Sequence, residues 1–203
     1  MNRRIILAAG ILSAAMAFGQ GMVNLGNNVR NTPASPRGTA ALAFDFNAGE
    51  VRRGPADMQI QLPGGPNGLL HRKSFTDRGN GNGLWLGSAN LRGDSSVALT
   101  ILNGFLAGTI QVGTDFYEIR PTSTGHVIEK LDLGKFPPGA PPVPGPAPDA
   151  NIGTAPVVET TAATAADPVV IDLMSVYTPQ ARTAAGGTAQ IQALIQSAVD
   201  NAN

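Results

Sequence analysis

Cysteine is missing from this sequence of 203 residues. Disulfide bonds, a thiolate nucleophile and thiolate metal ligands are therefore excluded in any compartment. The 14 Lys and Arg residues balance the 14 Asp and Glu residues, and no basic run is longer than a pair. A protein that neutralises a row of phosphates needs a concentration of positive charge. We therefore expect no nucleic-acid partner.

Aromatic residues are few, at 5% of the chain, whereas glycine and proline are abundant. Glycine and proline, with 25 and 16 residues, make up about a fifth of the chain. This composition favours turn-rich β-structure and open connections over a large helical core.

The N-terminus has the pattern of a secretory signal peptide. Arg3 and Arg4 precede an apolar run over residues 5–17, and Ala15 and Ala17 offer the small side chains of a cleavage site. This run is shorter than the roughly 20 residues that cross a bilayer. We interpret residues 1–19 as a signal peptide, with no membrane span after its removal. The expected location is secreted, or in a bacterial envelope.

Residues 20–38 have no sustained period and predict a flexible lead-in. Residues 39–133 then predict a β-rich domain, because short apolar runs alternate with turn residues about every 8–12 positions. We expect an antiparallel meander that forms a small sandwich or open barrel. The expected strands cover residues 40–46, 58–62, 69–75, 97–102, 108–112, 116–119 and 126–131.

Turn residues divide these strands. Residues 77–83 are expected to form a loop, and Asn103-Gly104 a tight hairpin turn. Pro121 is expected to end its strand because it has no N–H for the ladder. The strand over 97–102 is apolar on both faces, which predicts a central position in the sheet.

The character of the chain changes at Gly134. Residues 134–167 are rich in Pro and Ala and predict a linker. Residues 169–177 predict a buried strand, and Thr188 can cap a helix whose apolar face is formed by Ile191, Leu194, Ile195, Ala198 and Val199. One strand and one helix bury too little area to fold alone. They either open a longer α/β domain or dock on the β-domain.

Two segments resemble a known family. The first contains Trp85-x-Gly87, then G-x-L-x-G-x-I from Gly104 and Y-x-I-x-P from Tyr117, and ends in Gly125-His126. It is similar to the propeptide domain of reprolysin-like (adamalysin-type) zinc metalloproteases. The second is V-I-D-L-M-S-V-Y-T-P-Q-A-R over residues 170–182, followed by Ile191, Leu194 and Asn201. It resembles the first strand and first helix of bacterial metzincin catalytic domains.

The resemblance implies a signal peptide, a propeptide and, at residues 168–203, the N-terminal fragment of a catalytic domain. The implied partner is the chain's own or a related catalytic domain, with zinc and protein substrates belonging to a full-length parent. The chain departs from the family because it has no H-E-x-x-H-x-x-G-x-x-H zinc motif. Without cysteine, it also lacks the thiol that silences zinc in many animal members. We therefore expect no catalytic, cofactor-binding or metal-binding residue in this chain.

The remaining polar residues have structural interpretations. The chain has two histidines, and a lone imidazole is no metal site. Trp85 is expected in the core, and the Gly-rich residues 79–83 lack the Lys-Ser/Thr of a phosphate loop. The candidates weighed on this basis are His71, His126, Asp115, Glu118, Glu129, Ser95, Ser96 and Ser123.

Two functions remain open. The first is the pro-region of a secreted zinc-dependent metalloendopeptidase, in which the propeptide assists folding and latency. The second is a secreted, non-enzymatic β-domain that binds a cell-surface or extracellular partner. The absence of a catalytic set fits both.

Processing is expected inside the linker. Its only basic residue is Lys135, so a cut at a dibasic site is not expected, whereas cleavage between Pro137 and Asp167 is. Mass spectrometry of the secreted protein should find the new N-terminus in that interval. A new N-terminus elsewhere, other than the one left by removal of the signal peptide, would contradict the prediction.

Overall fold

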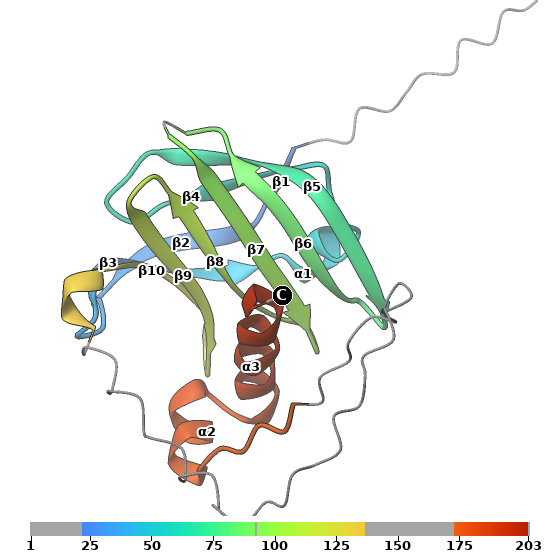
Figure 1. Cartoon of the computed structure of the whole chain (residues 1–203), viewed down its shortest axis with the longest axis vertical. Coiled ribbons are helices and arrows are strands. Elements are labelled where there is room, and N and C mark those ends of the chain that lie inside the picture. Colours follow the sequence, from blue (N-terminus) through green and yellow to red (C-terminus); the bar gives the residue numbers. More distant parts are fainter. Residues whose placement is uncertain (1–21, 92, 137–172, 203) are drawn as a thin grey trace, which may run out of the picture.

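The computed structural model describes residues 22–91, 93–136 and 173–202, and these residues form mostly β-sheet (Figure 1). Within them, ten strands make one sheet. The strands are β1 (Val23–Asn24), β2 (Gly26–Thr32), β3 (Gly38–Phe46), β4 (Asp57–Gln61), β5 (Asn67–Gly79), β6 (Asn82–Ala89), β7 (Ser95–Leu102), β8 (Phe105–Val112), β9 (Asp115–Thr122) and β10 (Gly125–Leu131). The helices are α1 (Ala48–Val51), the 3-10 helix η1 (Leu133–Lys135), α2 (Pro179–Ala185) and α3 (Thr188–Ala202).

The strands from β4 to β10 form an antiparallel meander, as the sequence predicts. β3 then pairs with β10, and β2 with β3, so the order is β1-β4-β5-β6-β7-β8-β9-β10-β3-β2. β1 and β2 are consecutive in the chain but lie at opposite edges of this order. The sheet is therefore rolled into a nearly closed barrel, which confirms the mostly β class.

Leu25 is the point where the two edges of the sheet meet. Its N–H donates to the carbonyl of Gln59 in β4 at 2.9 Å, and its carbonyl accepts from the N–H of Asn47 after β3 at 3.2 Å. Its side chain is completely buried. One residue therefore carries main-chain hydrogen bonds to both sides of the seam and also fills the space between them.

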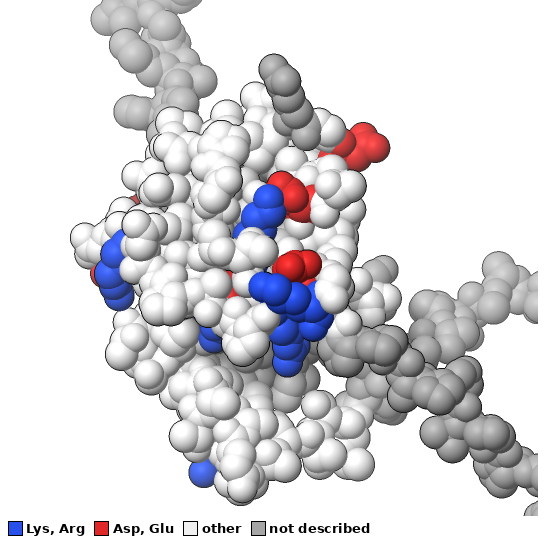
Figure 2. Space-filling view, turned by 90° about the vertical axis from the view of Figure 1, so that its left-hand side faces the viewer, with Lys and Arg blue, Asp and Glu red and all other residues white. Residues whose placement is uncertain are grey.

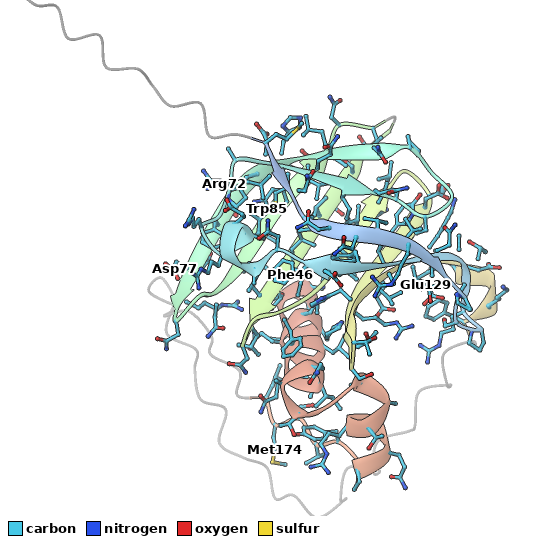
Figure 3. All side chains as sticks on the ribbon, turned by 180° about the vertical axis from the view of Figure 1, so that it is seen from behind. Phe46, Arg72, Asp77, Trp85, Glu129 and Met174 are labelled. Atoms are coloured by element: carbon cyan, nitrogen blue, oxygen red, sulfur yellow. The ribbon has the colours of Figure 1, made fainter. Side chains whose placement is uncertain are left out.

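The barrel interior is apolar because alternate residues of each strand face inward. Trp85 on β6 is fully buried, as expected for a core residue, and its Nε1–H donates to the carbonyl of Pro55 at 2.9 Å (Figure 3). The buried core consists of Leu25, Leu42, Phe44, Val51, Met58, Ile60, Leu62, Leu70, Trp85, Ala89, Val97, Leu99, Ile101, Leu106, Ile110, Tyr117, Ile119 and Ile128.

The hairpin turn at Asn103-Gly104 is confirmed, with φ values of 52° and 80° that suit a two-residue turn. The loop expected over residues 77–83 is wrong. β5 runs to Gly79 and β6 starts at Asn82, so only Asn80 and Gly81 form the turn, again with positive φ. The glycines and asparagines there make one tight hairpin rather than an irregular segment.

Pro121 does not end its strand, since β9 continues to Thr122. On the β8 side, the pairing of β9 stops at Ile119, which lies opposite Gly108. The missing N–H of Pro121 therefore interrupts no ladder on that side. On the other side, Pro121 lies opposite His126 of β10.

The flexible lead-in expected over residues 20–38 is wrong where the structure describes it. β1 and β2 occupy most of residues 23–32 and form the two edges of the seam. β2 is polar and largely exposed, so its sequence has no alternation of apolar residues from which a strand could be predicted. Main-chain pairing to β3 holds it in place, with an irregularity between Asn27 and Arg30.

The strand expected over residues 169–177 is wrong for its described part. Residues 173–178 form neither strand nor helix, and residues 169–172 lie outside the described residues. Leu173, Met174 and Val176 are 70, 89 and 83% exposed, so this apolar segment buries little of its surface. Met174 lies at the α2 end of the molecule, away from the barrel (Figure 3).

α2 was not predicted, although both of its ends have residues that are typical of helix ends. The side chain of Thr178 accepts from the N–H of Ala181 at 3.1 Å, and Pro179 occupies the first turn. Gly186 ends α2 in the left-handed conformation, with φ 98°. A Cβ at Gly186 would lie 2.5 Å from the main-chain nitrogen of Ser123, so the bend between α2 and α3 approaches the β9–β10 turn closely.

α3 was predicted as a helix beginning near Thr188, and this is confirmed. It packs on the outer face of β7, β8 and β9 (Figure 1). Of the two arrangements left open for this segment, the structure shows docking on the β-domain. β7 accordingly has Leu99 in the core and Thr100 buried on the opposite face, which confirms its central position.

Substituting Leu25→Ala should destabilise the barrel by about 2–5 kcal/mol, because it leaves a cavity where the edges meet. Val29→Ala is the matched control, since Val29 on β2 is 39% exposed and the change should cost less than about 1 kcal/mol. Urea unfolding followed by Trp85 fluorescence measures both variants. Equal losses would contradict a central role for Leu25.

Candidate helix-docking site

The side chain of Asp200 on α3 is held by two strands of the barrel. Its carboxylate accepts two hydrogen bonds from the guanidinium of Arg78 on β5, at 2.6 and 2.9 Å. The hydroxyl of Thr100 on β7 donates to the same carboxylate at 2.6 Å, and Gln196 adds a hydrogen bond at 3.0 Å from α3 itself. We call the contact of Asp200 with Arg78 and Thr100 the clasp.

Asp200 and Thr100 of the clasp are removed from solvent, whereas 32% of the Arg78 side chain is exposed. The side chain of Asp200 is only 2% exposed, and Thr100 is 1% exposed. Burial by itself would raise the pKa of Asp200. The hydrogen bonds from Arg78, Thr100 and Gln196 outweigh that effect and hold the pKa below its ordinary value. The hydrogen bond to Asp200 likewise raises the pKa of Arg78, so both partners stay charged at neutral pH.

Small side chains let α3 approach the sheet. Ala193, Ser197 and Asp200 are buried on one face of the helix, at spacings of four and three residues. The strand residues on the outer face include the fully buried Ala107. The apolar face predicted from the sequence is therefore wrong for Ala198, which is exposed, whereas Ile191 is buried as expected.

Further polar contacts lie along the helix. Thr109 on β8 donates to Asn201 at 2.8 Å, and Asn103 donates to Gln192 at 3.4 Å. Between α3 and strands β8 and β9 lies an open groove of about 410 Å³ whose lining includes Phe116. The helix is thus fastened at several points and leaves part of the groove beside it unfilled.

Neither Arg78 nor Asp200 was singled out from the sequence. The sequence feature that could have indicated this site is Asp200, which shares one helix face with the small residues Ala193 and Ser197. A buried helix face usually carries apolar residues at such positions. An acid at such a position indicates a buried partner of opposite charge. The sequence does not say which of the 14 basic residues that partner is.

His126 is buried at one end of the barrel and lies on the same face of β10 as the core residue Ile128. Its Nε2 accepts the main-chain N–H of Leu106 at 3.0 Å. Its Nδ1 has no hydrogen-bond partner among the described residues. Three aromatic rings surround it, at centroid distances of 5.7 Å (Phe44), 5.2 Å (Phe46) and 6.1 Å (Phe105).

This environment keeps His126 neutral. Burial lowers its pKa from 6.5 to about 4, against a small opposing effect of Asp45. The accepted hydrogen bond requires the lone pair of Nε2, so the proton of the neutral ring is on Nδ1. The pairing of β8 with β9 ends at Gly108, opposite Ile119, and Gly108 is two residues from Leu106. His126 therefore pairs a main-chain N–H near the point where that ladder ends.

His71 is a surface residue of β5, as expected, and its Nδ1 lies 2.6 Å from Asp57 on β4. Asp115 pairs with Lys130 at 2.8 Å. The hydroxyl of Ser95 bonds the main chain of Ala89. Ser96 and Ser123 are exposed, and no described contact joins either of them to a histidine. The structure gives these residues no common site.

Glu118 and Glu129 are brought together, because they lie directly opposite each other on β9 and β10. Burial raises the pKa of Glu118; Arg120 opposes this effect and Glu129 adds to it. The side chain of Glu129 is 2% exposed, lies 3.8 Å from Arg120, and accepts the N–H of Ser35 (Figure 3).

The carboxylate of Glu129 has a structural role. Its partner Ser35 belongs to the segment that leads into β3, and a Cβ at Gly38 would collide with the Glu129 side chain. Glu129 thus fixes the chain between β2 and β3 against β10. An open groove of about 430 Å³ lies beside it, lined by Ser35, Pro36, Arg37, Glu118, Arg120, Glu129 and Leu131.

The electrostatic surface is mixed. On the face shown in Figure 2, Lys and Arg side chains lie beside Asp and Glu, and most of the surface is uncharged. The described part of the chain contains no group of three or more His, Cys, Asp or Glu residues placed to hold a metal ion. None of its helices is long and apolar enough to cross a membrane.

Comparisons of the chain with protein families, with curated proteins and with solved structures found no match.

The burial of His126 predicts a pH dependence of stability. The unfolded chain takes up a proton near pH 6.5, whereas the folded protein does so only near pH 4. The contribution of His126 to the free energy of unfolding should therefore fall by about 3 kcal/mol as the pH drops through that interval, whereas the raised pKa of Glu118 acts in the opposite direction.

Urea unfolding at pH 7 and pH 4.5 measures this loss in the wild type, in His126→Phe and in the control His71→Asn. His126→Phe should remove most of the slope, although it also leaves the N–H of Leu106 without its acceptor. His71→Asn should retain the contribution of His126, because this change leaves the hydrogen bond between His126 and Leu106 in place. An unchanged slope in His126→Phe would contradict the assignment.

Proposed function

We propose that this chain is the pro-region portion of a secreted zinc-dependent metalloendopeptidase, followed by the first part of the catalytic segment. In this proposal the barrel assists folding and holds the following segment in a latent state. The chain itself performs no catalysis, because it lacks the H-E-x-x-H-x-x-G-x-x-H motif. Zinc and protein substrates belong to the parent enzyme.

The observation that carries this proposal is the seat of α3 on the barrel. By resemblance, residues 168–203 belong to the catalytic segment, and α3 is the helix of that segment that the structure describes. A pro-region acts by binding the segment that follows it. The clasp of Asp200 with Arg78 and Thr100 supports such binding.

The order of the segments supports the same function. An export signal, a β-domain, a Pro-rich linker and a helix docked back on that β-domain follow one another in the chain. Latency in this proposal needs no thiol, since the contact is made by a carboxylate and a guanidinium. This matches the absence of cysteine.

A second function has its own observation. Beside the seam between β2 and β4 lies a groove of about 200 Å³, with amide side chains on its walls. Amides offer both donors and acceptors to an uncharged ligand. This groove favours a secreted binding domain without enzyme activity. Its lining includes Asn24, Asn27, Gln59, Gln61 and Asn67.

The coding sequence downstream of Asn203 tests the proposed function. We expect an open frame that encodes H-E-x-x-H-x-x-G-x-x-H, because the parent needs three histidines for zinc and a glutamate for the attacking water. The full chain added to an active adamalysin-type peptidase should also slow peptide hydrolysis.

A frame that closes without the motif would overturn the proposal. In that case, retention of the full chain on envelope material, with no effect on the peptidase, would support the binding domain. Asn67→Ala, on the wall of the seam groove, should weaken that retention and leave any peptidase inhibition unchanged.

A further inference from the structure

The clasp connects parts of the chain that lie on either side of the expected processing interval. Arg78 and Thr100 precede this interval, and Asp200 follows it. The contacts of Thr109 with Asn201 and of the β9–β10 turn with the α2–α3 bend also cross it. None of these contacts uses residues 137–172.

We propose that the barrel keeps α2 and α3 bound after the chain is cut, and that the clasp, rather than the connecting chain, determines when they leave. This inference depends on the proposed function only in assuming that the chain is cut between residues 137 and 167. The partner that the barrel recognises is a helix with small residues at two positions of one face and a carboxylate at a third, as in Ala193, Ser197 and Asp200.

Burial makes the carboxylate decisive for recognition. When α3 is in place, Asp200 and Thr100 are almost completely removed from water. A helix without the carboxylate would leave the Thr100 hydroxyl buried without its acceptor and the Arg78 guanidinium without its counter-ion. Removing the buried partner of this ion pair costs more than removing one partner of an exposed pair, although the partly exposed Arg78 keeps some contact with water. The barrel therefore discriminates against helices that lack an acid at this position.

Cutting the chain changes the binding from intramolecular to bimolecular. While the chain is intact, the connecting residues keep the local concentration of α2 and α3 high. After the cut, only the contacts themselves retain the segment. Retention at low micromolar protein concentration would show that the contacts suffice.

The experiment uses the full chain with a site-specific protease sequence in place of residues 148–154. After complete cleavage, native mass spectrometry and gel filtration should find the two pieces in one complex. Asp200→Asn should raise the dissociation constant at least about 100-fold. Arg53→Gln is the control, because Arg53 forms an exposed pair with Glu50 at 3.9 Å and should leave retention unchanged.

Trp85 separates release from unfolding, since it is the single tryptophan of the chain and lies in the barrel core. Its fluorescence should stay native in Asp200→Asn while the C-terminal piece is lost. Should that variant unfold the barrel, Thr100→Val decides instead, because it removes one hydrogen bond and should weaken retention about tenfold.

Two results would overturn the inference. One is separation of the wild-type pieces at micromolar concentration with Trp85 still native. The other is retention by the clasp variants that equals retention by the wild type. The assay contains no peptidase, so a failure of the proposed function and a failure of the clasp are seen in different experiments.

Discussion

The meeting of the two sheet edges at Leu25 is the constraint on which the rest of the structure depends. An open sheet leaves a row of unpaired main-chain groups at each edge. Here one short segment supplies the outer strand of both edges, with β1 on β4 and β2 on β3. The interior can be filled by apolar side chains only because this segment brings the edges together. The outer face of the central strands then becomes a rigid platform for α3.

This closure is non-local, which explains what could be read from the sequence and what could not. The meander from β4 to β10 follows from local alternation and turn residues, so it was predictable. β2 is polar, and its position is set by main-chain pairing with β3. β3 in turn pairs with β10, far along the chain, as in Phe44 opposite His126. No local pattern encodes such a partner.

The C-terminal segment shows a different limit. Residues 169–177 have the β-branched and apolar composition of a strand, but composition supplies no neighbouring strand for pairing. For its described part, the structure shows neither pairing nor burial. α2, in contrast, has the capping residues Thr178 and Gly186, from which a helix could have been predicted. The packed face of α3 was misjudged because the small residues Ala193 and Ser197 are buried on it and Ala198 is not.

The buried titratable groups all serve the architecture. His126 is kept neutral and accepts one main-chain N–H, Glu129 ties the chain between β2 and β3 to β10, and Asp200 fastens α3. Their described neighbours are the main-chain N–H of Leu106 for His126, Glu118 and Arg120 for Glu129, and Arg78 and Thr100 for Asp200. In these contacts the buried groups hold segments of the chain in place.

The two functions considered for this chain use different parts of the barrel. The seam groove lies beside β1, β2 and β4, whereas α3 covers β7, β8 and β9, in the middle of the strand order. Because the seam joins the two ends of that order, the groove and the helix seat lie on different sides of the barrel. A ligand in the groove would not compete with α3. Binding there is compatible with either function, so the helix seat is the feature that separates a pro-region from a simple binding domain.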